Sequence, residues 1–329
     1  MTSTNPPDSA LPLEHVLFEV KRVIVGQDVL LERMAVALIA DGHLLVEGVP
    51  GLAKTLAVRS LAAAIDGTFQ RVQFTPDLVP ADLVGTRVYH QHSGEFKTEL
   101  GPVFANLLLA DEINRAPAKV QSALLEVMQE HQVTIGRETF PVPEPFLVMA
   151  TENPIESEGT YPLPEAQVDR FMMKVIVDYP STTEEQAIVA RALRPPEPPR
   201  PMATTNDLMA MRERARQVYV DPAIVDYAVR LVAVTRSPAT AGLGELERYV
   251  TYGASPRASI ALVTGARALA FLRGRDYVLP HDVSELALDV LRHRVVLSYE
   301  ALADDVDADT IVNRVLGAVR APDVVLQNR

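Results

Sequence analysis

The stretch HLLVEGVPGLAKTLAVRSLAAAI, residues 43–65, decides the fold. It begins as an apolar run, passes through a turn that contains Gly48 and Gly51, and continues as a helical pattern from Lys54. The glycines let the backbone curl tightly, so that successive N–H groups and the helix N-terminus can face phosphate oxygens. Lys54 adds a positive charge there, and the hydroxyl of Thr55 is an oxygen ligand for Mg²⁺. This order of strand, turn, Lys-Thr and helix predicts a phosphate-binding loop rather than an ordinary glycine turn.

One position of the loop departs from the general pattern. Ala53 stands where that pattern has a third glycine. Because a Cβ atom makes positive φ costly, we expect the backbone of Ala53 to avoid the left-handed region. The remaining loop positions expected to contact a nucleotide are Val49, Pro50, Leu52 and Leu56.

Outward from this loop, short apolar runs alternate with helical patterns as far as about residue 178. Such near-continuous apolar strands, alternating with helices, are typical of a parallel sheet covered on both faces. The expected strands are HLLVEG (43–48), FQRVQF (69–74), NLLLADE (106–112), FLVMATEN (146–153) and MMKVIVDY (172–179). The expected helices include residues 13–24, 29–40, 54–65 and 117–130.

Two insertions interrupt this alternation. Residues 83–104 contain LVGTRVYH and EFKTEL around Ser93-Gly94, a pattern typical of a β-hairpin. A second insertion, QVTIGRETFPV, precedes the fourth strand. We therefore expect an α/β core that carries inserted β-hairpins.

After Tyr179 the strand patterns stop and helix start signals follow. Thr182 with Glu185 has the spacing of a capping box, and proline opens three further periodic stretches at Pro222, Pro256 and Pro280. The predicted domains are a flexible tail over 1–12, an α/β nucleotide-binding core over 13–180 and a smaller all-helical lid domain over 181–329.

Polar residues follow two of the predicted strands. Asp111 and Glu112 end the third strand, an arrangement suited to a Mg²⁺ contact from Asp111 and a general base, Glu112, for an attacking water. Asn153 ends the fourth strand and could hydrogen-bond a γ-phosphate or orient the water. A solvated strand end and a turn before Pro154 are the structural alternatives for these residues.

Two arginines have no evident local partner. Arg257 falls in the first turn of a helix, where the dipole disfavours a cation by about 0.3–1 kcal/mol, so an anion from outside would resolve the conflict. Arg170 lies just before the fifth strand. A surface ion pair, for Arg170 with Asp169 or a nearby Glu, is the alternative reading of both.

Composition excludes several classes of protein. The 329 residues carry a net charge of −12, which argues against a surface built to coat nucleic acid or anionic lipid. They include no Cys, which excludes disulfide scaffolds and thiolate chemistry. The sequence shows neither a signal peptide nor an apolar run long enough to span a bilayer. We therefore expect a soluble protein of the cytoplasm.

Two further residue pairs have simple interpretations. His90 and His92 lack an evident third ligand, so we do not expect a metal site there. Met172 and Met173 are expected to lie in the hydrophobic core.

The motifs together resemble those of the MoxR family of AAA+ ATPases, over nearly the whole chain from about residue 13. The resemblance rests on four segments: GVPGLAKT (48–55), LLLADEINRAPAKVQSALLEVMQE (107–130), ATENPIESEGTYPLPEAQVDRF (150–171) and GASPRA (253–258). It implies that Asn153 corresponds to sensor 1, Arg170 to an arginine finger and Arg257 to sensor 2. It also implies that Gly26 and Gln27 lie near the adenine and that Ala53 is the family's own variant.

The resemblance implies an activity as well. A Mg²⁺-dependent ATPase would work as a homo-oligomeric ring, expected to be a hexamer, and would remodel or mature partner proteins, including those with von Willebrand factor A domains, some by metal insertion. The alternatives are a motor subunit of a metal chelatase, a DNA translocase or helicase, and a nucleotide-binding scaffold without turnover. Nucleic acid is the less expected partner because the first hairpin carries little positive charge. Glu152, which replaces a commoner Gln, is expected to point away from phosphate, and the role of Arg115 is left open.

Overall fold

The computed structural model describes residues 11–92, 94–154, 159–193 and 197–323. Five parallel strands form the central sheet in the order β2-β5-β8-β1-β9. They are β1 (Leu44–Glu47), β2 (Phe69–Gln73), β5 (Leu107–Asp111), β8 (Leu147–Glu152) and β9 (Met173–Ile176). All five were expected from the sequence, and the parallel α/β fold is confirmed.

Helices and short elements surround the sheet. In the first two thirds of the chain they are α1 (Leu11–Val23), α2 (Asp28–Ala40), α3 (Lys54–Ala64), α4 (Pro80–Val84), η1 (Ile113–Arg115), α5 (Ala118–Glu130), α6 (Glu165–Val168), α7 (Thr182–Ala192) and α8 (Thr205–Arg216). The helix α1 begins at Leu11, inside the predicted tail, whose residues 1–10 lie outside the described part of the chain.

Alternating side chains of the strands belong to two separate apolar cores. Leu44 and Val46 of β1 pack into a core with α1, α2 and α3, whereas Leu45 between them belongs to a second core with α5. The same alternation divides β5, where Leu107 and Leu109 face the first core and Leu108 the second. Each buried aliphatic side chain of this kind contributes about 1.5–3 kcal/mol. Burial on both faces explains why β1 and β5 are apolar along almost their whole length.

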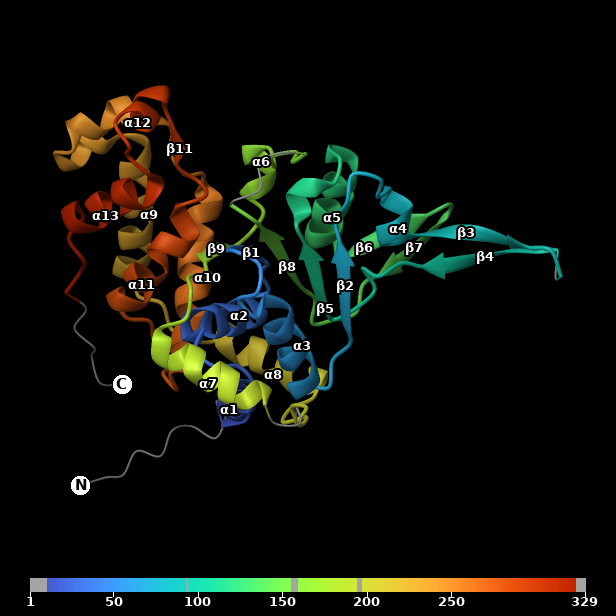
Figure 1. Ribbon diagram of the computed structural model, residues 1–329. Helices are drawn as coiled ribbons and strands as arrows, with labels where there is room; N and C mark the ends of the chain where they lie inside the picture. Colours follow the sequence, from blue (N-terminus) through green and yellow to red (C-terminus); the bar gives the residue numbers. More distant parts are fainter. Residues whose placement is uncertain (1–10, 93, 155–158, 194–196, 324–329) are drawn as a thin grey trace, which may run out of the picture.

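Both predicted hairpins are present. The first pairs β3 (Gly85–His90) with β4 (Glu95–Leu100), and the second pairs β6 (Gln132–Ile135) with β7 (Glu138–Pro141), each antiparallel. Ser93, at the tip of the first hairpin, lies outside the described residues. Figure 1 shows β3 and β4 extending well beyond the rest of the molecule.

The last third of the chain is mainly helical and lies to one side of the sheet (Figure 1). Its elements are α9 (Pro222–Arg236), η2 (Pro238–Ala241), η3 (Gly244–Tyr249), β10 (Val250–Tyr252), α10 (Pro256–Leu272), α11 (Pro280–Leu291), β11 (Val296–Leu297), α12 (Tyr299–Ala303) and α13 (Ala308–Ala318). The prediction of an all-helical lid was wrong in one respect, since β10 and β11 form a two-stranded antiparallel sheet. These strands are only three and two residues long, too short for a periodic signal.

Helix start signals located the helices well, with one shift. The capping box of α7 uses Ser181 and Glu184 instead of Thr182 and Glu185. Asp221 and Ser255 cap α9 and α10, directly before Pro222 and Pro256, the prolines expected to open these helices. The helix boundaries therefore follow local hydrogen-bonding chemistry, as predicted.

Helices α7 and α8 belong spatially to the nucleotide-binding half, although the predicted boundary at residue 180 assigns them to the lid. The guanidinium of Arg191 in α7 donates to the carbonyl of Lys21 in α1 at 3.4 Å, and that of Arg212 in α8 donates to the carbonyl of Leu38 in α2 at 2.7 Å. The helix α10 packs on α2 as well. The division of the chain at residue 180 stays a prediction. No helix in the described part of the chain is long and apolar enough to cross a bilayer.

Candidate nucleotide site and arginine pocket

The predicted phosphate loop lies between β1 and α3, as the sequence indicated. Gly51 has a φ of +90°, and a Cβ atom placed there would meet no heavy atom within 4 Å, so the space above the loop is open. At Gly48 the opposite holds, because a Cβ atom would lie 2.8 Å from the carbonyl oxygen of Val177. The two glycines therefore serve different purposes: one permits the turn, the other permits close packing on the chain after β9. Val49, Pro50, Leu52, Ala53 and Leu56 complete the loop and the first turn of α3.

The prediction for the backbone of Ala53 was wrong. Ala53 has φ 57° and ψ 15°, which is the left-handed region that an alanine avoids. The conformation costs about 1–2 kcal/mol relative to a right-handed one. The turn into α3 requires this backbone geometry even though the residue is an alanine. The loop is therefore strained at the start of α3, beside the predicted phosphate site.

Lys54 begins α3 and turns back over the loop. Its ammonium group donates to the carbonyl of Gly48 at 2.5 Å. Partial burial lowers the pKa of Lys54, and the nearby carboxylates of Asp111, Glu112 and Glu47 oppose that shift. A cation held among carboxylates at a helix N-terminus is in place to receive phosphate oxygens.

The side chains around the loop fit a nucleotide with Mg²⁺. The first N–H groups of α3 have no partner within the helix, and Ala53 has no polar side chain with which to cap them. Thr55 and Asp111 supply a hydroxyl and a carboxylate, the hard oxygen ligands that Mg²⁺ prefers. Among the residues that the structure describes, no three His, Asp or Glu side chains gather to form a metal cage. Mg²⁺ at nucleotide sites is usually held by one or two carboxylates together with substrate phosphates.

Asp111 ends β5 with both carboxylate oxygens engaged. Oδ1 accepts from the hydroxyl of Thr151 at 2.6 Å, and Oδ2 accepts from the Nη2 of Arg71 at 2.6 Å. The hydroxyl of Thr151 also accepts from the N–H of Glu112 at 2.9 Å, which fixes the turn between the two acids. Asp111 is thus oriented by the neighbouring strands on both sides of β5.

Glu112 follows in a left-handed conformation, with φ 56°. Its Oε2 accepts from the side-chain amide of Gln73 at 2.8 Å and lies 2.9 Å from the Nε of Arg115. Arg115, whose role the sequence left open, therefore pairs with Glu112 three residues before it. A general base held by an amide and a guanidinium has to exchange these partners for a water molecule before it can act.

Asn153 and Glu152 lie at the end of β8, beside β1 and β5. Asn153 is 7% exposed, so its amide is buried at the same edge of the sheet as the phosphate loop. Burial raises the pKa of Glu152, whose carboxylate lies 3.9 Å from the ammonium of Lys174. Lys174 also pairs with Glu47 at 2.6 Å. This cation offsets part of the negative charge that Glu152 adds near the site.

Gly26 and Gln27 form the turn between α1 and α2, both with positive φ. The side chain of Gln27 donates to the carbonyl of Asp178 at 3.3 Å, and a Cβ atom at Gly26 would lie 2.5 Å from the carboxylate of Glu184. The turn therefore packs on the segment that leaves β9, which pairs with β1. It lies at the phosphate-loop edge of the sheet.

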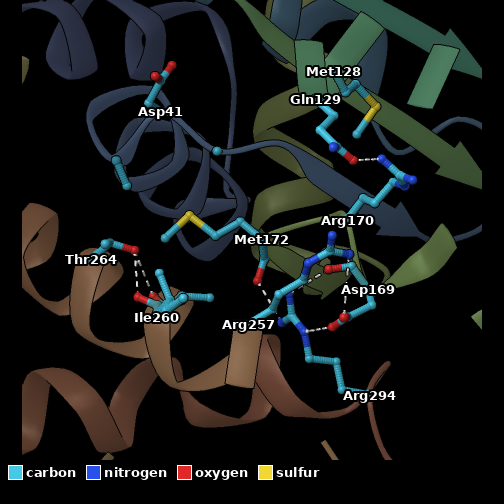
Figure 2. A pocket seen from close by; sticks show the side chains of 13 residues that line it. Asp41, Met128, Gln129, Asp169, Arg170, Met172, Arg257, Ile260, Thr264 and Arg294 are labelled. Atoms are coloured by element: carbon cyan, nitrogen blue, oxygen red, sulfur yellow. Dashed lines mark hydrogen bonds and ion pairs between the residues drawn. The ribbon is translucent and has the colours of Figure 1, made fainter. Parts of the chain in front are cut away.

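The two arginines meet in a different place. Arg170 and Arg257 line one cavity of about 320 Å³ together with Asp169 and Arg294 (Figure 2). Arg257, and not Arg170, lies beside Asp169, with 3.8 Å between Nη1 and Oδ2. Arg170 instead donates to the side chain of Gln129, and its buried Nε has no hydrogen-bond partner in the part of the chain that the structure describes. Within the described part of the chain, the guanidinium of Arg170 is thus incompletely satisfied. We name this cavity the arginine pocket.

The arginine pocket and the phosphate loop lie at opposite edges of the sheet. The pocket is lined by Gly42, which precedes β1, and by Gln129 at the C-terminal end of α5. The phosphate loop follows β1, and Glu112 precedes α5. The length of β1 is about 13 Å at 3.3 Å per residue, and that of α5 is about 20 Å at 1.5 Å per residue. The arginines therefore do not reach the phosphate loop of their own chain in this conformation.

Sequence reasoning missed several residues of these sites. Arg71 and Gln73 alternate with period two on β2, so a polar face of that strand was a usable signal. Thr151 directly precedes Glu152 and Asn153 in a polar strand end, another signal of the same kind. Arg294, within a basic run after α11, gave none.

Comparisons with known proteins agree with this geometry. A profile of the ATPase family associated with various cellular activities (AAA) matches residues 43–173, and a profile of the AAA lid domain matches residues 246–315. The chain is 59% identical to Chaperone MoxR1 of Mycobacterium tuberculosis, over 95% of this chain and 83% of that protein. It belongs to the MoxR family of AAA+ ATPases. The resemblance seen in the sequence is confirmed.

Two further proteins extend the similarity. Protein MoxR of Methylorubrum extorquens is 31% identical over 92% of this chain and 93% of its own. A crystal structure of a protein from Cytophaga hutchinsonii superposes with a TM-score of 0.91 at 47% identity, covering 96% of both chains. Chain and relatives thus share their architecture from the α/β core through the lid.

Proposed function

We propose that this MoxR-family protein hydrolyses ATP with Mg²⁺ in a closed ring, where each nucleotide lies between two subunits. One subunit would hold the phosphates with Lys54 and the loop, and the next would supply Arg170 and Arg257. The observation that carries this proposal is the separation of the two groups at opposite edges of one sheet. A head-to-tail interface brings such edges together and closes into a ring if the rotation permits, for which we propose a hexamer.

The residues at the loop would divide the work of hydrolysis. Lys54 and the N–H groups of α3 would bind the phosphates, and Thr55 with Asp111 would hold Mg²⁺, which neutralises charge on the phosphates when bound. Glu112, released from Gln73, would take a proton from the attacking water, and Asn153 would orient that water. We place Gly26 and Gln27 beside the adenine because their turn lies at the same edge.

Arg170 and Arg257 would stabilise charge on the neighbour's triphosphate. An arginine supplied in this way contributes about 10³–10⁵ in rate in other phosphoryl-transfer enzymes. Because Arg257 belongs to α10, loss of the γ-phosphate in one subunit would release Arg257 of the next subunit and so allow the lid of that subunit to move. The movement that results would act on partner proteins, in a chaperone-like manner. The similarity to Chaperone MoxR1 supports this use, and the projecting hairpin β3–β4 would be a contact element.

Mixing two inactive variants tests the shared site. Glu112→Gln and Arg170→Ala should each bind ATP and barely hydrolyse it, whereas Lys54→Ala should not bind. In a one-to-one mixture, about a quarter of the sites pair an intact Glu112 with an intact Arg170, so about a quarter of the wild-type rate should return. Arg257→Ala should behave like Arg170→Ala. No rescue at any mixing ratio would show that each site is complete within one chain.

A further inference from the structure

Arg294, from the lid, is buried beside the arginine pocket with every donor used. Its side chain is 2% exposed. Nε donates to Oδ1 of Asp169 at 2.7 Å, Nη1 donates to the carbonyls of Met172 and Val290, and Nη2 donates to the carbonyls of Asp169 and Phe171. An arginine has five N–H groups in a fixed planar fork, and all five have an acceptor here.

Four of these five hydrogen bonds go to the short segment that contains Arg170. They hold the carbonyls of Asp169, Phe171 and Met172, on both sides of Arg170, and the carboxylate of Asp169. A residue of the lid thus fixes the backbone from which Arg170 projects. Bonds to a buried guanidinium are charge-assisted and rigid, so they restrict the direction of the neighbouring side chain.

Asp169 extends this connection to Arg257. Its Oδ1 accepts from Arg294, while its Oδ2 accepts from the hydroxyl of Ser255 at 2.9 Å and lies 3.8 Å from Arg257. Figure 2 shows Asp169, Arg257 and Arg294 gathered beside Arg170. One carboxylate therefore joins the start of α10, Arg294 three residues after α11, and the Arg170 segment.

We propose that Arg294 is a positioning residue, which holds Arg170 and Arg257 in one fixed arrangement for the triphosphate of the neighbouring subunit. The inference rests on the proposed function, because it assumes that both arginines act on another chain. Arg294 itself has no donor left for phosphate, so it acts only through the segment that it holds. A misplacement of about 1 Å at a reacting group can cost about 10²-fold in rate.

The variant that tests this is Arg294→Lys. Lysine keeps the positive charge beside Asp169 but has three donors on one atom, so it cannot also hold the carbonyls on both sides of Arg170. We expect the variant to bind a fluorescent ATP analogue with unchanged affinity, because its own phosphate loop is intact. Its turnover should fall by about 10²-fold. Mixed one-to-one with Glu112→Gln, it should recover about a quarter of the wild-type rate, as Arg170→Ala does.

Arg292→Lys is the matched control. Arg292 lies two residues away, is 11% exposed and pairs with Asp309 at 3.0 Å, on the side of α13. The control should keep its turnover within about threefold of wild type, since Arg292 does not line the arginine pocket and lysine keeps the positive charge beside Asp309. Asp169→Asn changes the other partner of the Arg294–Asp169 contact. It should show the same loss of turnover as Arg294→Lys and the same recovery when mixed with Glu112→Gln.

The outcomes separate this inference from the proposed function. Near-normal turnover of Arg294→Lys, with Arg170→Ala still rescued, would overturn the positioning role alone. A loss that Glu112→Gln cannot rescue, while it rescues Arg170→Ala, would mean that Arg294 serves its own chain, which also overturns the role. If neither variant is rescued, the shared site is wrong and the inference falls with it.

Discussion

Because Ala53 has a left-handed backbone, its replacement by glycine should raise the free energy of unfolding, whereas glycine within an ordinary helix lowers it. With φ 57° the alanine costs about 1–2 kcal/mol, which glycine would not. Glycine at the same position also loses more chain entropy on folding, by about 0.4–1 kcal/mol. Ala53→Gly should therefore stabilise the nucleotide-free protein by about 0.8 kcal/mol, within a range of about 0–1.6 kcal/mol.

The matched control is Ala63→Gly, ten positions along in the last turn of α3. There glycine only adds flexibility to a helix, and the variant should be destabilised by up to about 1 kcal/mol. For a domain of this size 1 kcal/mol corresponds to about 2–4 °C, so the melting temperatures should move in opposite directions by a few degrees. Circular dichroism at 222 nm follows both transitions. Equal destabilisation by the two glycines would refute the strained geometry of the loop.

Three further predictions concern the same half of the molecule. Gly48→Ala should weaken binding of a fluorescent ATP analogue by about tenfold, because its Cβ atom would meet the Val177 carbonyl at 2.8 Å; unchanged affinity would contradict the packing. Burial lowers the pKa of His43 to about 4, so the unfolded chain takes up a proton at this position first as the pH falls, and His43 by itself should lower the free energy of unfolding by about 2 kcal/mol between pH 7 and pH 5, beside a drop of the same sign from buried His293, whose pKa is also lowered by burial. His43→Asn, whose Oδ1 can still accept from the N–H of Val148, should lessen that drop in urea denaturation, and an identical drop would rule out His43 as its source. Asp111→Asn should raise the Mg²⁺ concentration for half-maximal hydrolysis by about tenfold, and chelation by EDTA should stop hydrolysis; a variant with normal Mg²⁺ dependence would remove Asp111 from the metal site.

The separation of the two charged groups bears on how the lid takes part. Arg257 and Arg294 both belong to the lid half of the chain, and both contact Asp169 just before β9. The lid is therefore fixed to the edge of the sheet that faces away from its own phosphate loop. In a ring, a change at one nucleotide would reach the lid of the neighbour before its own.

The sequence by itself determined the elements of the core and the position of the predicted phosphate loop. Apolar runs of four to six residues between helical patterns were enough to place β1, β5 and β8, because strands buried on both faces are apolar throughout. Lys54 and Thr55 were predictable for a similar reason, since the loop, its glycines and its helix are contiguous in the chain. Features that depend on residues close together in the chain could thus be predicted from the sequence.

Only the tertiary structure decided which residues from distant segments of the chain contact each other. The sequence could not show that Arg257 joins Asp169, 88 positions earlier in the chain, or that Arg294 holds the carbonyls around Arg170. It also suggested the wrong backbone for Ala53, because the closure of the turn onto α3 overrides the preference of a single residue. Contacts between buried charges depend on which edges and faces meet in space, and no periodicity along the chain encodes that meeting.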